Sequence, residues 1–163
     1  CKHYFHQECI VAAFQHSNKC PVCFRMYGCR PGDQPPGTMD VSIRDTPKLD
    51  GHTCGTITIR YDFPSGTQGP RHPSPGKRYS GTSRTAYLPD NEGGREVLEL
   101  LKRGFDMRCL FTIGTSVTTG RANCVIWAGI HHKTNTSGGP ARFGYPDDTY
   151  FARVKLELAS KGI

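Results

Sequence analysis

The chain has 163 residues, of which 36% are hydrophobic and 21% are charged, and its formal net charge at pH 7 is +7. These proportions are ordinary for a folded globular protein, and they exclude both a chain that is disordered throughout and one built of membrane spans. The length fits one domain of about 130 residues beside a smaller unit, and the positive charge favours anionic partners such as phosphates, acidic proteins or nucleic acid.

Side chains that bind zinc are concentrated in the first 23 residues. They form three pairs, which are Cys1 with His3, His6 with Cys9, and Cys20 with Cys23. A structural zinc site takes four nitrogen or sulfur ligands in a tetrahedron, and each close pair can supply two of them. A disulfide framework is the alternative, but it requires an oxidising compartment, and the sequence shows no secretory signal. The other cysteines are expected to be reduced thiols of an intracellular protein, in the cytoplasm or nucleus: Cys29, Cys54, Cys109 and Cys124.

The order C-x-H-x-F-H-x-x-C followed by C-P-x-C resembles the carboxyl-terminal part of a RING finger. In that family the second and fourth ligand pairs share one zinc ion. The resemblance therefore implies one complete site, made of Cys1, His3, Cys20 and Cys23. It implies that His6 and Cys9 are half of a second site, whose other pair would lie upstream, so we expect the sequence to be a piece of a longer protein.

One short helix is expected over residues 10–14, between the third and fourth ligand pairs. The RING resemblance implies that Ile10, Phe14 and Pro21 contact a ubiquitin-conjugating enzyme (E2). For Ile10 and Phe14, packing around the zinc is an equally open alternative. The resemblance also raises the question of whether Arg25 helps to hold the ubiquitin thioester in a reactive pose.

Residues 24–50 are dense in glycine, proline and turn residues, and we find no helical or strand period in them. We interpret the stretch as a connector stiffened by proline. The expected organisation is a zinc unit at residues 1–27, a Pro/Gly-rich linker at 28–40 and a second domain at 41–163.

The second domain begins with a strand at residues 56–61, where Ile57, Ile59 and Tyr61 alternate with polar residues. Residues 63–81 are expected to form a functional or mobile loop, followed by a second strand at 84–88. A helix over residues 92–105 is predicted to begin at the N-cap Asp90. Its apolar face recurs at helical spacing: Val97, Leu98, Leu101 and Phe105.

Two short strands at residues 109–113 and 124–127 and a last helix over 149–160 complete the expected elements. In the last helix Tyr150, Val154 and Leu158 should point inward. Strands and helices without regular alternation favour the α+β class.

Several motifs beyond the zinc ligands resemble the Deltex family of E3 ubiquitin ligases. Gln-Pro-x-Gly-x-Met occupies residues 34–39, and further matching stretches are residues 81–89, 111–116, Trp127, 130–134, 144–147 and a terminal Lys-Gly-Ile. The resemblance covers the whole chain. It implies a RING remnant followed by a Deltex C-terminal α+β domain with a mixed or antiparallel sheet and flanking helices.

The residues themselves suggest a nucleotide pocket in this domain. Gly81 allows close backbone approach, Arg84 within Gly-Thr-Ser-Arg offers a planar fork for phosphate, and the neighbouring Thr82 and Ser83 are polar. Tyr87, Trp127 and Phe143 could stack on a nucleobase. The alternatives left open are core packing for the aromatic residues and a plain surface charge for Arg84.

The Deltex resemblance implies that this domain binds ADP-ribose or NAD. It places the family's pocket histidine at His131, its pocket serine at Ser116 and its acidic residue at Glu157. Phe143 stands where several relatives have histidine or tyrosine; it can stack but neither donates nor accepts a hydrogen bond. This departure favours the third-Deltex branch over the first, Notch-associated members.

The implied mechanism uses His131 as a base on a ribose hydroxyl, with Glu157 orienting it or the ribose. Ubiquitin would pass from a charged E2 to a lysine or to ADP-ribose, and the other implied partners are ADP-ribosylated proteins or nucleic acid. Two readings of a different class remain: a reader of ADP-ribosylated proteins without chemistry of its own, and a zinc-containing nucleic-acid binder.

Overall fold

The computed structural model describes residues 1–24, 27 and 31–163. Its helices are α1 (Gln7–His16), α2 (Glu92–Asp106), α3 (Tyr150–Ser160) and the 3-10 turn η1 (Pro140–Arg142). Its strands are β1 (Thr38–Arg44), β2 (Thr56–Phe63), β3 (Gly66–Thr67), β4 (Arg78–Tyr79), β5 (Thr82–Pro89), β6 (Phe111–Gly114) and β7 (Cys124–Trp127). The ladders between these strands are antiparallel, which confirms the α+β class.

Helix α1 is longer than the segment predicted at residues 10–14. It follows His6, which occupies the N-cap position, and none of its residues is buried. Phe14 makes a ring contact with Tyr27, with the centroids 6.1 Å apart. Helix α1 therefore has no core-forming face of its own, and Cys1 with His3 and Cys20 with Cys23 lie on either side of it in the chain.

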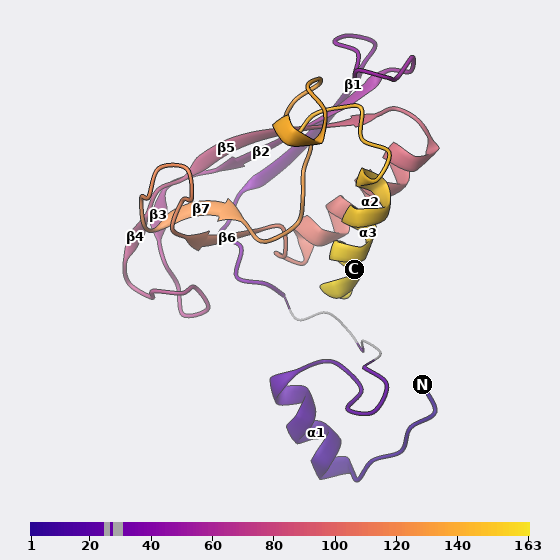
Figure 1. Ribbon diagram of the computed structural model, residues 1–163. Helices are drawn as coiled ribbons and strands as arrows, with labels where there is room; N and C mark the ends of the chain where they lie inside the picture. Colours follow the sequence, from indigo (N-terminus) through magenta and orange to yellow (C-terminus); the bar gives the residue numbers. More distant parts are fainter. Residues whose placement is uncertain (25–26, 28–30) are drawn as a thin grey trace.

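The main sheet has the order β1–β2–β5, and Figure 1 shows α2 and α3 side by side along one side of it. Strict alternation in β2 turns Ile57, Ile59, Tyr61 and Phe63 into the core. The core continues into the buried faces of α2 and α3, where the predicted inward residues are found: Val97, Leu98, Leu101, Tyr150, Val154 and Leu158. Phe105, also predicted, is only partly buried.

The expectation of no strand in residues 24–50 is wrong for β1. Residues 38–44 pair with β2 along their whole length, from Thr38 opposite Asp62 to Arg44 opposite Thr56. Met39, Val41 and Ile43 do alternate with polar residues, but glycines and prolines on both sides concealed the pattern. Pairing with a strong neighbour strand, rather than local propensity, stabilises β1.

The segment 31–37, expected to be part of a connector, is bound to the second domain. The Gly32 N–H donates to the Met107 carbonyl at 2.8 Å. Gln34 is buried, and its side chain accepts from the Phe111 N–H at 3.2 Å and donates to the Phe105 carbonyl at 3.4 Å. A Cβ at Gly37 would lie 2.4 Å from the Phe63 ring. The Gln-Pro-x-Gly-x-Met motif therefore has a structural explanation, since it closes one end of the core.

The stretch 63–81 is organised by a buried side chain. It contains the short β3–β4 ladder, and Gln68 lies at its centre. The Gln68 amide donates to the Asn123 side chain at 2.9 Å and accepts from the Ser74 N–H at 2.9 Å. These bonds attach the stretch to the loop between β6 and β7.

Helix α2 begins at Glu92, as predicted, but its N-cap differs from the predicted Asp90. The N-cap is Asn91, whose side chain accepts from the Gly94 N–H at 2.9 Å. Asp90, the predicted cap, instead forms an ion pair with Arg95 at 2.7 Å. Asn and Asp cap helices about equally well, so the local sequence could not decide between them.

Two further observations concern the chain as a whole. Among the described residues, none of the helices combines the length and the apolar character needed to span a bilayer.

Cys54, Cys109 and Cys124 are free thiols. Cys29 and Arg25 lie outside the described residues.

Candidate functional site

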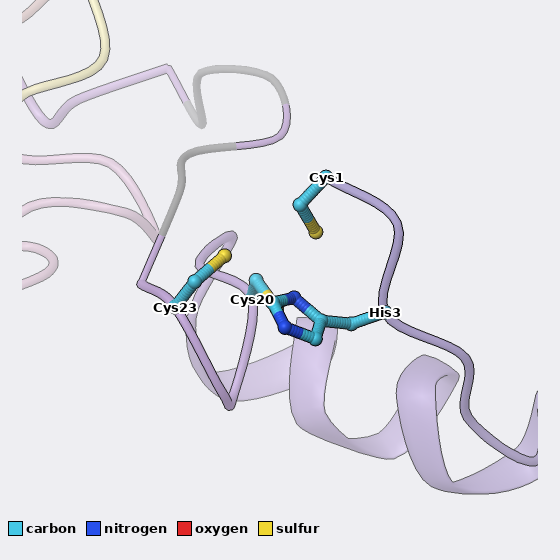
Figure 2. A group of neighbouring side chains, drawn as sticks. All are labelled: Cys1, His3, Cys20 and Cys23. Atoms are coloured by element: carbon cyan, nitrogen blue, oxygen red, sulfur yellow. The ribbon is translucent and has the colours of Figure 1, made fainter.

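The four side chains predicted to share one zinc ion lie together. The ligand atoms of Cys1, His3, Cys20 and Cys23 are all within 4.8 Å of one another, and the Cys20 Sγ is 3.6 Å from the His3 Nδ1. Figure 2 shows them turned toward one another, two from the segment before α1 and two from the segment after it. Ligands of a tetrahedral zinc lie about 4 Å apart, so this group can hold a metal ion.

The environment of Cys20 suits metal binding. It is 1% exposed, and burial by itself would raise its pKa. Hydrogen bonds from the backbone of Cys23 and Val22 and from the Cys23 side chain outweigh this effect, so the pKa of the Cys20 thiol is lowered. The thiolate is the form that binds metal. Three sulfurs and one imidazole are a donor set that zinc favours.

The other predicted contacts of this unit lie on α1 or beside the ligands. His6 and Cys9 are exposed and do not belong to a group of three or more ligands in the described part of the chain. Ile10 and Phe14 are half-buried, whereas Pro21 is exposed. His6 and Cys9 remain the predicted half-site, and Ile10, Phe14 and Pro21 the predicted E2 contacts.

In the second domain the structure joins two predicted catalytic residues that are 26 positions apart. The Glu157 carboxylate, on α3, accepts from the His131 N–H at 2.8 Å and lies 2.5 Å from the His131 Nδ1. The Tyr150 hydroxyl donates to the His131 carbonyl at 3.2 Å. The His131 side chain is 54% exposed, and that of Glu157 is 19% exposed. This two-point contact holds the imidazole in one orientation on the surface.

The contact also assigns the ring nitrogens their roles. With a carboxylate next to it, Nδ1 carries the proton and donates, so the Nε2 lone pair of a neutral imidazole is left free. An exposed nitrogen that can accept a proton, backed by a carboxylate that stabilises the resulting charge, is the arrangement of a general base.

The neighbouring His132 is a core residue. Its Nδ1 donates to the Ile130 carbonyl at 2.9 Å, its Nε2 is 3.1 Å from the Tyr61 hydroxyl, and its ring stacks on Trp127 with centroids 4.1 Å apart. Burial lowers the pKa of His132 to about 4. Trp127 also stacks on Phe111 at 4.3 Å, so core packing, the alternative left open for Trp127, is its observed environment.

The residues of Gly-Thr-Ser-Arg lie at the start of β5 and point in two directions. Thr82 and Arg84 share the face of the buried Ala86 and Leu88, whereas Ser83 and Tyr87 lie on the opposite face. Ser83 donates to the Asp62 carboxylate. Tyr87 lines a hollow of about 440 Å³ on the outer side of the sheet. The structure therefore does not bring Tyr87 and Arg84 together in one pocket.

Arg84 is exposed, and its guanidinium donates to the Ser83 carbonyl at 3.0 Å. Gly81, three residues earlier, lies at a crowded point, where a Cβ would be 2.1 Å from the Phe63 carbonyl oxygen. Glycine is required there by packing within the chain, so close approach to a ligand is not needed to explain it. Arg84 keeps a free face for an anion.

Ser116 and Phe143 lie in turns. The Ser116 hydroxyl accepts from the Thr119 N–H at 3.3 Å, within the loop that follows β6. Phe143 has a left-handed backbone (φ 54) and a side chain that is 58% exposed. Its carbonyl accepts from the Thr134 and Asn135 N–H groups at 3.0 and 3.2 Å. Phe143 is thus attached to the segment that carries His131.

Sequence reasoning missed Lys133, whose buried side chain is bonded to the segment that follows Phe143. It is 2% exposed, and its ammonium donates to the Gly144 carbonyl at 2.8 Å and to Asp147 at 2.6 Å. Burial opposes the charge on Asp147, but hydrogen bonds from Lys133, Thr149 and Arg153 keep the pKa of this carboxyl well below its usual value. The matching stretches 130–134 and 144–147 contain both partners and were the only signal.

Comparisons with known proteins agree with this architecture. The family model described as "Deltex C-terminal domain" matches residues 31–163. The chain is 53% identical over 165 residues to "Probable E3 ubiquitin-protein ligase DTX3" of Homo sapiens, an alignment that covers 100% of the chain and 48% of that protein. Identity is 46% to "E3 ubiquitin-protein ligase DTX4" of Mus musculus, in an alignment that covers 100% of the chain and 28% of that protein. It is 43% to "E3 ubiquitin-protein ligase DTX1" of Homo sapiens, in an alignment that covers 100% of the chain and 27% of that protein.

The chain thus spans about half the length, or less, of these curated relatives. Of the three, DTX3 is the most similar, in agreement with the expected third-Deltex branch. The sequence motifs, the antiparallel α+β fold and the family match are consistent with one another. The chain belongs to the Deltex family, and its residues 31–163 form a Deltex C-terminal domain.

Proposed function

We propose that this chain is the ubiquitin-transferring part of an intracellular Deltex-type E3 ligase. Relatives that align over the whole chain are named "Probable E3 ubiquitin-protein ligase DTX3" and "E3 ubiquitin-protein ligase DTX4". In this proposal the N-terminal unit binds zinc and an E2 charged with ubiquitin. The C-terminal domain binds ADP-ribose, NAD or an ADP-ribosylated protein, and ubiquitin passes to a substrate lysine or to a ribose hydroxyl.

The geometry of the N-terminal unit supports the first half of the proposal. A zinc ion on Cys1, His3, Cys20 and Cys23 would tie the segment before α1 to the segment after it. This would orient α1, which has no buried face of its own, and with it Ile10 and Phe14. The metal supplies structure here and no bond-making step.

The observation that carries the second half is the two-point contact of Glu157 with His131. A hydroxyl is a weak nucleophile until its proton is removed. As the ribose oxygen attacks the thioester carbonyl, Nε2 of His131 takes the hydroxyl proton and Glu157 stabilises the imidazolium. The new C–O bond forms, the C–S bond breaks, and the E2 cysteine leaves as a thiolate.

The remaining predicted ligand contacts complete the proposal. Arg84 is a candidate partner for the pyrophosphate, because it is exposed and carries a planar fork. Ser116, Thr82 and Phe143 are candidate contacts for the rest of ADP-ribose. Phe143 would offer a stacking face only.

The test compares two acceptors in one assay. The full-length protein is incubated with E1, E2, ATP and ubiquitin, together with either a lysine substrate or ADP-ribose. Hydroxylamine cleaves the ester to ADP-ribose and spares the amide to lysine. We expect Glu157→Gln and His131→Ala to lose transfer to ADP-ribose by about 100-fold, with a smaller loss of ADP-ribose binding and intact transfer to lysine.

A matched control is Glu99→Gln, which removes an exposed glutamate of α2 that pairs with Lys102 at 2.7 Å. It should leave both reactions unchanged. Equal loss of lysine and ADP-ribose conjugates in the Glu157 and His131 variants would show that these residues are structural. ADP-ribose binding without any conjugate in the wild type would favour the reader.

One observation favours the nucleic-acid binder as a second candidate. Residues 63–89 contain no aspartate or glutamate, and neither do residues 107–146. The loops of these two stretches pack together through Gln68 and Asn123, and they carry exposed cations: Arg71, Lys77, Arg78, Arg84 and Arg121. If this surface binds nucleic acid, the affinity for a generic DNA duplex will fall steeply with salt concentration. A weak dependence on salt would argue against it.

A further inference from the structure

Strand β1 is an edge strand, and only one of its two edges pairs with another strand in the described chain. It lies at one end of the order β1–β2–β5 (Figure 1), and β2 is its only strand partner among the described residues. Seven residues pair with β2, so the other edge of β1 is long enough to pair with a further strand. Exposed edges of this length are sites at which a second chain can add.

The apolar side of β1 is uncovered as well. Val41 is opposite Ile59, and Ile43 is opposite Ile57, so all four side chains lie on the same face of the sheet. The two β2 residues are 0% exposed, whereas Val41 is 37% and Ile43 is 54% exposed. The pattern of a buried strand therefore extends onto β1, but the described chain covers Val41 and Ile43 only in part.

The sequence of β1 is complementary to itself. If two copies pair antiparallel about Ser42, Asp40 of each copy lies opposite Arg44 of the other, and Val41 lies opposite Ile43. The register thus produces two opposite-charge pairs on one face and two apolar pairs on the other. Each such cross-strand pair is stabilising. Pairing about Val41 or Ile43 instead would place no opposite charge of the second copy beside Asp40 or Arg44, and Asp40 would keep only Arg60 of its own chain opposite it.

From this complementarity we propose that two copies of the chain associate through β1, antiparallel about Ser42. The result is a continuous six-stranded sheet across a two-fold axis, in the order β5–β2–β1–β1–β2–β5. Charged residues on an edge strand normally discourage such pairing. Here Asp40 and Arg44 neutralise each other across the axis, so they select the second copy of this chain over other strands. The proposal does not depend on the ligase function.

The test is a charge exchange read by sedimentation equilibrium over the micromolar to sub-millimolar range. The wild-type chain should self-associate to a dimer. In Asp40→Arg the introduced arginine meets Arg44 of the second copy, and in Arg44→Asp the introduced aspartate meets Asp40. Each variant alone should form a dimer that is at least about tenfold weaker than that of the wild type.

An equimolar mixture of the two variants should recover the wild-type affinity as a heterodimer, because both charge pairs are then restored with opposite sign. Ile43→Lys, at a side chain that is already exposed, should weaken the dimer without changing thermal stability. Leu156→Lys, at an apolar residue of α3 that is even more exposed than Ile43, is the control and should leave the dimer intact.

A wild-type chain that remains monomeric over this range overturns the proposal, whether the edge is then solvated or occupied by another protein. A dimer that is indifferent to the single exchanges, or variants whose mixture stays monomeric, also overturns it. The direct structural measurement is hydrogen exchange. Amides of β1 should become more protected as the protein concentration rises, and those of β6 should not.

Discussion

Two adjacent histidines have opposite properties because their surroundings differ. The His131 ring is exposed and held by a carboxylate. The His132 ring is 6% exposed, stacked on Trp127 and held neutral between the Ile130 carbonyl and the Tyr61 hydroxyl. Residue type alone could not distinguish them. The difference lies in what each side chain faces, since His131 lies against Glu157 of α3 and His132 lies among core aromatic rings.

The buried neutral His132 predicts a pH dependence of stability. The pKa of His132 falls from 6.5 to about 4 on folding. Between these pH values the His132 imidazole therefore binds a proton in the unfolded chain but not in the native chain. The contribution is fully present above pH 6.5 and is lost as the pH falls toward 4, a decrease of about 3 kcal/mol in the free energy of unfolding. Urea titrations followed by the fluorescence of Trp127, the single tryptophan, measure it.

His132→Gln should be less stable at neutral pH, and its stability should fall less between pH 6.5 and 4. Asp147 changes the stability little in this pH window. The pKa of its carboxyl is lowered in the native chain, so its contribution to the free energy of unfolding is lost mainly below pH 3.8. The same slope in wild type and variant would mean that His132 does not remain neutral.

Phe143 predicts a gain of function at the residue scale. Its side chain is 58% exposed beside the segment that carries His131, and it has no hydrogen-bonding group. Phe143→His restores such a group, so ADP-ribose should bind more tightly or accept ubiquitin faster, by about three- to tenfold for one hydrogen bond. Calorimetric titration and the acceptor assay measure the two effects. Unchanged values in both would place Phe143 outside the ligand site.

At the scale of elements, the segment 31–37 behaves as part of the core. The Gln34 side chain gives the buried Phe111 N–H its acceptor, and it adds a second donor to the Phe105 carbonyl, which also accepts from the Arg108 N–H at 2.9 Å. The need of buried backbone groups for hydrogen-bond partners explains why a glutamine, and not an apolar residue, lies in this apolar environment.

Gln34→Leu should therefore lower the stability of the second domain by about 2 kcal/mol, since the buried Phe111 N–H loses its acceptor. The matched control is Asp33→Asn on the preceding residue, which keeps an oxygen to accept from the Thr112 hydroxyl. It should change stability by less than about 1 kcal/mol. Urea unfolding followed by Trp127 fluorescence compares the two. Similar losses in both variants would show that Gln34 has no special role.

At the scale of the whole molecule, the metal unit and the second domain should be separable. Metal analysis should give about one tightly held zinc per chain, because one group of four ligands is complete. Cys20→Ser should release it and unfold α1, since binding and folding are coupled in so small a unit. The Trp127 signal of the second domain should persist. Two tightly held zinc ions would contradict the ligand pairing.

A chain of residues 31–163 should accordingly bind ADP-ribose as well as the longer one, because the candidate ligand residues all lie beyond residue 80. Calorimetry on both chains compares the affinities. Loss of binding on removal of the first 30 residues would mean that the ligand site extends into the metal unit.

Local signals determined much of this protein. The spacing of cysteines and histidines predicted three pairs of zinc ligands, and the RING resemblance implied that Cys1, His3, Cys20 and Cys23 share one site, as the structure shows them grouped. Periodicity predicted β2, α2 and α3 and the residues that they bury. These features depend on neighbours within about one turn or one strand, so they can be read from the sequence.

Other features required the tertiary structure, because they depend on contacts between distant segments. β1 exists through its pairing with β2, and Gln34 becomes a core residue only when 31–37 packs against the end of α2 and the start of β6. The sequence pattern placed Tyr87 and Arg84 in one pocket, and the alternation of β5 separates them. His131 was predicted as the base, but its two-point contact with Glu157 arises only from the packing of α3 against the segment after β7, which no local pattern specifies.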